Sequence, residues 1–312
     1  MRSMTARVLV LLATICPLAS TGSAQSRGPI IDVHMHAFDM SWVRFVASID
    51  SSWWPRAIPH PTDSDSLRIQ SIRALRNNGI VRAIASGTAL QTVARYQAED
   101  PQRIIPALMF GRDMNVDSLR AAYRRGAIQS LGEVIWQYEG LSPADTSLER
   151  FWALAEELDA PIGLHMGLGP PDWPRHGPYR ISLSDPLQLE DVLARHPHLR
   201  LWVMHAGWPL LDRIVGLLYA YQNVYVDVSV INWYIPRPEF HAYLKRLVDA
   251  GFGNRIMYGS DQMIWPASVP IGIAAIADAS FLTRQQKRDI LCNNAARFFR
   301  LDPAICRDKG AA

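Results

Sequence analysis

Two histidines, His34 and His36, stand at the end of an apolar run that begins at Ile30, with Met35 between them. Imidazole is a common ligand of zinc and of similar divalent ions. At the C-terminal end of a strand, where the backbone leaves the sheet, both side chains can turn onto one metal ion. The pair alone is a weak signal, so its meaning depends on the residues at corresponding places downstream.

Side chains suited to metal binding or proton transfer also stand at the ends of later apolar runs. They are Glu133, His165, His205 and Asp261, so that four of the nine histidines of the chain fall at such places. A buried histidine bonded to the backbone would explain one of these positions, but it explains four poorly. We therefore predict that these residues form one metal-binding and catalytic site.

The same residues indicate hydrolytic chemistry. Three histidines and one carboxylate leave room for a water molecule on a metal ion, which lowers the pKa of that water toward ~7 and polarises a carbonyl group. Asp261 is the expected general base, which passes the proton to the leaving group. His205 is expected to donate a hydrogen bond to the developing oxyanion. Asp32 is expected to point away from the site, where it caps a turn or orients a ligand.

Eight apolar runs of strand length must position these residues, and several lack polar alternation, as strands covered on both faces do. The predicted strands are Ile30–His36, Ile80–Ser86, Arg103–Phe110, Ile128–Trp136, Pro161–Met166, Leu199–His205, Val224–Val230 and Arg255–Asp261. In a barrel of such strands the active site lies at their C-terminal ends. The candidate residues would then meet at one end of the molecule.

Amphipathic helical segments lie between the runs. Predicted helices cover Asp65–Asn78 and begin at Ser142, Asp185, Pro238 and the capping-box residue Thr283. The alternation favours an α/β fold, a single-domain (β/α)8 TIM barrel. A doubly wound open sheet is the alternative, but no glycine-rich phosphate loop follows any strand. The first strand lies so near the start of the predicted mature chain that no N-terminal β-sandwich subdomain is expected.

Residues 1–24 have the pattern of a secretory signal peptide. Arg2 and Arg7 precede the short apolar run Val8–Leu18, and a small-residue cleavage site follows. The apolar run is too short for a stable membrane anchor. We expect an exported protein, periplasmic or secreted, whose domain covers residues 25–312. Its net charge falls from +3 to +1 on cleavage, which argues against nucleic acid as a partner.

Cleavage removes Cys16 and leaves two cysteines, Cys292 and Cys306. Export would place them where disulfides persist. The sequence leaves open whether they are bridged or are free, partly buried thiols. A bridge would contribute on the order of 3 kcal/mol of stability in the chain-entropy model.

Aromatic and cationic residues on the side of the predicted site point to substrate contacts. The tryptophans that follow strand ends are Trp53, Trp54, Trp136, Trp173, Trp208, Trp233 and Trp265, and the arginines on that side are Arg56, Arg112, Arg175, Arg180 and Arg237. They predict an aromatic-walled pocket for a flat or apolar substrate. Among them we assign Trp208, Trp265, Arg112 and His176 to substrate binding, since an arginine could pair with a carboxylate. The long segment Ala37–Ser64 is expected to act as a lid.

The whole mature chain resembles the amidohydrolase superfamily, in the branch often called amidohydrolase-related or amidohydrolase 2. The motifs that carry the resemblance are Asp32 to His36, His165, His205 to Trp208, Tyr258 to Asp261 and Asn294 to Phe299. It implies that His34, His36, His165 and Asp261 hold a divalent metal and that His205 is catalytic or a further ligand. Relatives that bind two metals often place a lysine or glutamate at the end of the fourth strand. Because Glu133 stands at that position here, the resemblance leaves open whether one or two metals bind.

These expectations describe an exported hydrolase that attacks an amide, ester or lactone carbonyl of a small molecule. The runner-up is a metal-dependent decarboxylase or hydratase of carboxylated aromatic or ring-cleavage compounds; export weighs against it, because such catabolism usually sits in the cytoplasm. A non-catalytic metal- or ligand-binding barrel is a third reading, which Asp261 and His205 disfavour. The expected cofactor is Zn²⁺. An exported protein would acquire its metal outside the cytoplasm, which favours zinc over readily oxidised iron. Oligomeric state is left open.

Overall fold

The structure of the 312-residue chain is a computed structural model that describes residues 28–41, 44–45 and 58–307. Eight parallel strands form one sheet in which each strand pairs with its neighbour in the sequence. They are β1 (Ile30–His36), β2 (Ile80–Gly87), β3 (Ile104–Leu108), β4 (Ser130–Val134), β5 (Ile162–His165), β6 (Leu201–Met204), β7 (Tyr225–Asp227) and β8 (Ile256–Met257). The predicted (β/α)8 barrel is confirmed.

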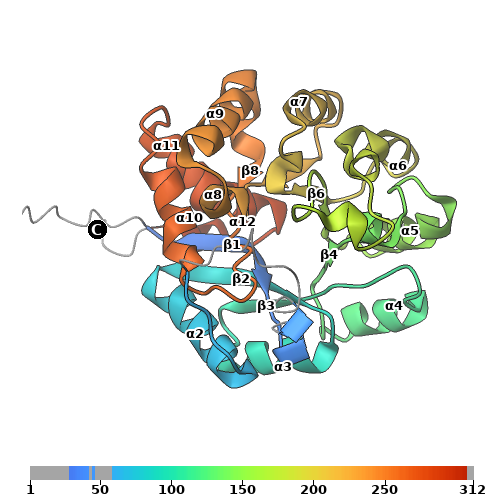
Figure 1. Ribbon diagram of the computed structural model, residues 1–312, viewed down its shortest axis with the longest axis horizontal. Coiled ribbons are helices and arrows are strands. Elements are labelled where there is room, and N and C mark those ends of the chain that lie inside the picture. Colours follow the sequence, from blue (N-terminus) through green and yellow to red (C-terminus); the bar gives the residue numbers. More distant parts are fainter. Residues whose placement is uncertain (1–27, 42–43, 46–57, 308–312) are drawn as a thin grey trace, which may run out of the picture.

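The helices surround the sheet in sequence order, so the colours of Figure 1 run once around the molecule. They are α2 (Ser64–Asn77), α3 (Leu90–Glu99), α4 (Val116–Arg124), α5 (Glu149–Glu157), α6 (Glu190–Arg195), α7 (Leu211–Ala220), α8 (Ile231–Tyr234), α9 (Arg237–Leu247), α10 (Ser268–Ala277), α11 (Arg284–Arg288) and α12 (Asn294–Phe298). In the described part of the chain, none of the helices has the length and apolarity that crossing a membrane requires.

Most predicted strands are longer than the strands observed, because the ladder of hydrogen bonds ends before the apolar run does. The largest helix difference is at α5, which begins at Glu149 and not at Ser142. Ser142 Oγ accepts the N–H of Ala144 at 3.2 Å, and Asp145 caps a short 3₁₀ turn before the helix. The capping chemistry read from the sequence is therefore present, but it serves turns that precede the helix.

The barrel has a packed interior and a separate outer core. The interior cluster includes Ile31, Val33, Ile84, Ala107, Trp202, Met204 and Met257. These side chains come from β1, β2, β3, β6 and β8, and strands on opposite sides of a barrel can meet only across its inside. Residues that alternate with them pack between the sheet and the helices. The interior is thus filled below the strand ends where the predicted site lies.

An irregularity in β1 decides where its two histidines point. The register of β1 with β2 shifts between Asp32 and Met35. Val33 lies in the interior cluster, and the bulge after it lets His34 and His36 face the inside of the barrel as well. Without the extra residue, side-chain alternation would place Val33 and His34 on opposite faces.

The seam between β8 and β1 is closed by backbone hydrogen bonds. Val33 N donates to Tyr258 O at 3.0 Å, and Asp261 N donates to His34 O at 2.6 Å. These bonds hold the residues that follow β8 against β1, which brings Asp261 beside the two histidines.

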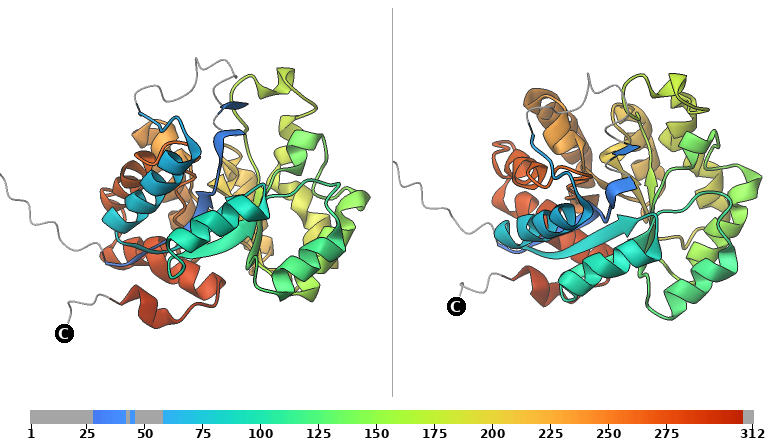
Figure 2. Two further views of the ribbon diagram at one scale, coloured as in Figure 1. Left: turned by 90° about the horizontal axis from the view of Figure 1, so that it is seen from below. Right: turned by 60° about the horizontal axis from the view of Figure 1, so that its bottom comes forward.

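The C-terminal segment packs at one end of the barrel, where Figure 2 shows the red helices. The Arg288 guanidinium donates to Pro29 O at 2.9 Å and to Cys306 O at 3.1 Å. Cys306 is also bridged to Cys292, with 5.8 Å between the two Cα atoms. The disulfide that the sequence left open is therefore formed, and it fixes the last segment to the base of the seam.

Removing this disulfide should destabilise the fold by about 3 kcal/mol, because the unfolded chain regains the entropy of a loop of this size. The measurement is the urea midpoint of the double variant Cys292→Ser/Cys306→Ser against the unreduced parent. Ala304→Ser, a change at an exposed position two residues before Cys306, is the control and should leave the midpoint unchanged. Equal midpoints for the double variant and the parent would show that the bridge is not formed in the folded protein.

Candidate active site

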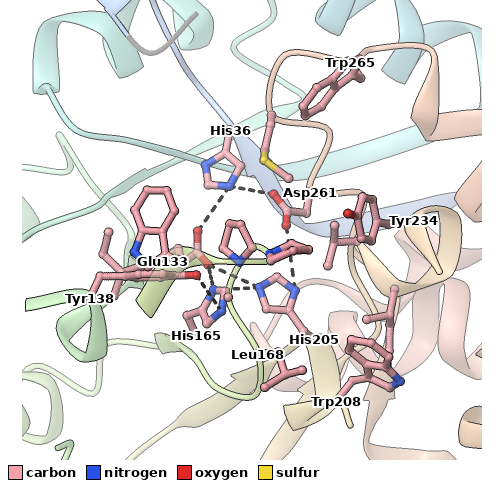
Figure 3. Close-up of a pocket in the computed structure, with 18 of the residues that line it drawn as sticks. His36, Glu133, Tyr138, His165, Leu168, His205, Trp208, Tyr234, Asp261 and Trp265 are labelled. Carbon is pink, nitrogen blue, oxygen red and sulfur yellow. Dashed lines mark hydrogen bonds and ion pairs between the residues drawn. The ribbon is translucent and has the colours of Figure 1, made fainter. Parts of the chain in front are cut away.

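Four side chains from β1, β4 and the segment after β8 converge at the C-terminal end of the barrel, and Figure 3 labels three of them, His36, Glu133 and Asp261. His36 Nε2 lies 2.9 Å from Asp261 Oδ1 and 3.3 Å from Glu133 Oε2. His34 Nε2 lies 3.5 Å from Glu133 Oε2 and 3.9 Å from Asp261 Oδ1. Ligand atoms that surround one ion at ~2.0–2.2 Å are separated by roughly 3–4 Å. His34, His36 and Glu133 each place one ligand atom within 4.8 Å of the others, which suits a single cation, and Asp261 Oδ1 stands beside both ring nitrogens.

Unsatisfied polar atoms support this reading. His34 Nε2 and Asp261 Oδ1 are buried and form no hydrogen bond within the described residues. Burial raises the pKa of Glu133, but the charge of His34 and the hydrogen bonds of neighbouring histidines outweigh it and hold the pKa well below its ordinary value. The pKa of Asp261 is also lowered, because the neighbouring histidines outweigh the effect of its burial. Two ionised carboxylates and two imidazoles in a buried space form a donor set that fits a divalent ion.

Backbone contacts of the strand ends fix these ligands. Gln262 clamps His36: its Oε1 accepts the His36 N–H at 2.9 Å and its Nε2 donates to His36 O at 2.8 Å. Ser86, in β2, accepts the N–H of Glu133 on its Oγ at 2.6 Å. The orientation of each ligand therefore depends on a polar residue from a neighbouring strand end.

Asp32 faces away from the cavity, as the sequence predicted. Its Oδ1 accepts the N–H of Ser260 at 2.8 Å and that of His34 at 3.1 Å. Burial raises the pKa of Asp32 to about 6. The side chain caps the turn after β8 and ties it to β1, so it supports the backbone on which Asp261 stands.

Ser229 and Asp227 orient two histidines at once. Ser229 Oγ donates to Asp227 Oδ1 at 2.5 Å and lies 2.8 Å from His34 Nδ1 and 3.0 Å from His205 Nδ1. Because its hydrogen goes to the carboxylate, the hydroxyl can only accept from the imidazoles. Both rings are thereby held with a proton on Nδ1, which leaves Nε2 as the nitrogen available for an ion or a proton.

His165 and His205 stand on the other side of Glu133. His165 Nδ1 is 2.7 Å and His205 Nε2 is 3.4 Å from Glu133 Oε1, and the two ring nitrogens are 3.0 Å apart. Tyr138 OH lies 3.3 Å from His165 Nε2. The predicted ligands are thus brought together in two groups that share Glu133, with His165 beside His205 and not among the first four side chains.

A cavity of about 470 Å³ opens above these residues. Trp208 and Trp265 line it, as predicted, and so do Phe38 and Phe45 from the segment expected to form a lid. Residues 42–43 and 46–57 of that segment, which include Trp53 and Trp54, lie outside the described residues.

Several residues assigned to this side of the barrel do not line the cavity, among them Arg112, His176 and Trp136. Arg112 is half exposed, and its backbone N–H donates to the Glu139 carboxylate at 3.1 Å. His176 is exposed in the loop after β5, near Trp173. Trp136 is fully buried and packs edge-on against Trp152 in the outer core. The position of a residue just after a strand predicts at which end of the barrel it lies, but it does not predict in which direction its side chain points.

Several site residues were missed by the sequence analysis: Ser86, Ser229, Gln262 and Tyr138. Each is one to four residues from a predicted strand end or within a predicted strand, but serine, glutamine and tyrosine are common at such places. The signal that could have found Ser229 and Gln262 is their position beside Asp227 and Asp261, because ligands need polar neighbours to orient them.

The profile of the amidohydrolase family matches residues 31–301. No curated protein matches the sequence significantly. Solved structures are similar in fold at low identity. An uncharacterised TIM-barrel protein from Bordetella bronchiseptica has a TM-score of 0.69 and 16% identity, covering 87% of this chain and 98% of that one.

Two further similar structures carry functional descriptions. A probable 2-pyrone-4,6-dicarboxylic acid hydrolase from Acinetobacter baumannii, with citric acid bound, has a TM-score of 0.62 and 17% identity, covering 87% of this chain and 99% of that one. A dihydroxybenzoic acid decarboxylase from a Polaromonas species, with manganese and the inhibitor 2-nitroresorcinol, has a TM-score of 0.63 and 15% identity, covering 88% and 97%.

Loss of one ligand should release the metal. His36→Ala and Asp261→Asn should each lower the bound divalent ion from near one equivalent to a small fraction after dialysis, measured by elemental analysis. His205→Asn should keep most of the ion, because its Nε2 faces His165 and the far oxygen of Glu133. His176→Ala is the matched control, since it removes an exposed imidazole outside the cavity. Release by His205→Asn as complete as that by His36→Ala would place His205 among the ligands of the same ion.

Metal binding should release protons at neutral pH. Burial lowers the pKa of His34 and His36, but Asp261 and Glu133 outweigh it and raise both above the ordinary value, His34 strongly so. The raised pKa values keep an extra proton on these rings to higher pH in the metal-free protein, and an ion must displace it. Affinity should rise with pH, and calorimetry in buffers of different ionisation enthalpy should detect the released protons. Buffer-independent heats at pH 7 would contradict the pairing described above.

Proposed function

The chain belongs to the amidohydrolase family, and from this premise we propose that it is an exported, metal-dependent hydrolase acting on an amide, ester or lactone of a small molecule. The observation that carries the proposal is the place of Asp261. Its Oδ1 faces the Nε2 atoms of His34 and His36, and the residue also lines the cavity. One carboxylate can therefore serve both an ion and the proton of an attacking water.

A divalent ion would be held by His34, His36, Glu133 and Asp261. When bound, it supplies Lewis acidity toward a carbonyl oxygen and makes water more acidic. His165 stands across Glu133, where it would complete the ligand set or, with His205, hold a second ion. We favour zinc, because an exported chain would acquire its metal outside the cytoplasm; manganese, present in the Polaromonas decarboxylase, is the alternative that elemental analysis distinguishes.

The side chains around the ion supply the proton transfers. The charge of His34 and the close approach of His36, whose Nε2 lies 2.9 Å from Asp261 Oδ1, lower the pKa of Asp261 against its burial, so the carboxylate can accept a proton from water and return it to the leaving group. His205 keeps its Nδ1 toward the Ser229 carbonyl at 3.2 Å. Its Nε2 is then the atom that can hold a proton at the floor of the cavity, where a developing oxyanion would need a donor.

A decarboxylase is the second candidate, and the observation that favours it is the fold similarity to several decarboxylases of hydroxylated benzoates. In that reading Asp261 would give a proton to a ring carbon and would take none from water. The predicted signal peptide at residues 1–24 favours the hydrolase, because it would separate the enzyme from a cytoplasmic catabolic pathway. The disulfide between Cys292 and Cys306 agrees with an oxidising compartment.

Product analysis in ¹⁸O-labelled water separates the two reactions. A panel of aryl esters, lactones, anilides and hydroxybenzoates is incubated with the metal-loaded enzyme. For the hydrolase, one labelled oxygen should appear in the product acid, and His205→Asn should lower the rate by on the order of 10²–10⁴ while the ion stays bound. Carbon dioxide released without incorporation of label would refute hydrolysis. Activity that persists after removal of the metal would refute the role of the ion.

A further inference from the structure

The walls of the cavity differ in chemistry from its floor. The floor carries three of the histidines described above, His36, His165 and His205, together with the two carboxylates. Aromatic and aliphatic side chains make up most of the described wall, among them Met109, Leu168, Trp208, Ile231, Trp233 and Trp265. Figure 3 shows Leu168, Trp208 and Trp265 around the floor residues. Among the described lining residues, a substrate would therefore meet carboxylates and imidazoles only at the floor.

The polar atoms of two wall tryptophans are already engaged elsewhere. Trp233 Nε1 donates to Ser260 O at 2.6 Å, and Trp208 Nε1 donates to Glu239 Oε1 at 3.4 Å. Each indole therefore offers a bound molecule ring surface and not an N–H donor. Such surfaces favour flat apolar groups, through area burial and ring stacking.

The arginines that the sequence placed on this side are also engaged away from the cavity. Within the described residues, Arg175 Nε pairs with Asp172 at 3.0 Å, Arg180 Nη1 donates to Tyr179 O at 2.6 Å, and Arg237 Nη2 donates to Ile271 O at 3.4 Å. Arg112 lies near Glu139, and none of the four is among the residues that line the cavity. Arg56 lies outside the described residues.

The floor itself gives a substrate carboxylate little attraction. Glu133 and Asp261 are both negative, so one divalent ion only balances them. A second anion on the substrate would lose its hydration against apolar walls without gaining a charged partner there, and that loss is costly.

From these contacts we propose that the site takes an uncharged, flat, apolar carbonyl compound, such as an aryl ester, an aromatic lactone or an anilide, and selects against its ring-carboxylated counterpart. This inference rests on the proposed hydrolase function for the class of bond that is cleaved. The cavity volume of about 470 Å³ lies within the range of small-molecule sites, roughly 300–1,000 Å³.

Matched pairs of compounds test the selectivity. Dihydrocoumarin and a ring-carboxylated dihydrocoumarin are compared as substrates of the metal-loaded enzyme by kcat/KM. 2-Acetylnaphthalene and 6-acetyl-2-naphthoate, which cannot be hydrolysed, are compared as ligands by quenching of tryptophan fluorescence. The neutral member of each pair should be favoured at least tenfold. Because the ligand pair needs no turnover, it reports on the cavity even if no ester or lactone is cleaved.

A charged wall should reverse part of this preference. Leu168 is half-buried in the loop after β5, so Leu168→Arg can keep its guanidinium near solvent and meet a ring carboxylate. The neutral-to-carboxylated ratio of the ligand pair should then fall severalfold, whereas Ile181→Arg, a change at a position 49% exposed and outside the cavity lining, should leave it unchanged.

The outcomes are separable. Equal or tighter binding of 6-acetyl-2-naphthoate by the parent overturns the inferred selectivity, and so does absence of binding by 2-acetylnaphthalene. Neutral selectivity in binding without cleavage of dihydrocoumarin or of any compound in the panel supports the inference about the cavity and overturns the hydrolase function.

Discussion

The buried carboxylate of Glu133 is the group on which the arrangement of the site depends. One of its oxygens lies within 3.5 Å of His34 and His36, and the other lies within 3.4 Å of His165 and His205. A negative charge in such a place is tolerated only when cations or protons balance it. The four imidazoles must therefore be held at fixed distances from one carboxylate, although they come from strands on different sides of the barrel.

Holding them requires polar residues that have no part in the reaction. Ser86 fixes the backbone of Glu133, Gln262 fixes that of His36, and Ser229 fixes the rings of His34 and His205 through Asp227. These contacts come from β2 and from the segments that follow β7 and β8. The site therefore depends on the alignment of several strand ends at the same end of the barrel. A shift in any one of these strands would move at least one ligand.

The sequence predicts strand positions and their terminal histidines because apolar runs of strand length and ligand side chains are both visible in one dimension. It does not predict how the ligands divide around Glu133, because that depends on ring orientations set by Ser229 and Tyr138 across the barrel. Arg112 fails as a substrate contact for a similar reason, since a nearby acid, Glu139, gives it a partner outside the cavity. The start of α5 is missed because a serine and a proline cap a turn as readily as a helix.

The seam of the barrel has a consequence for how the chain matures. β1 begins at Ile30 and pairs with β2 on one side, but its partner on the other side is the segment that follows β8, near the end of the chain. Arg288 and Cys306 secure the base of that seam. During synthesis the first strand therefore stays half-paired until nearly the whole polypeptide has left the ribosome. A closed barrel cannot form on a nascent chain that lacks these residues. The barrel can therefore close only when the roughly fifty residues from β8 to Cys306 are available to pack against β1.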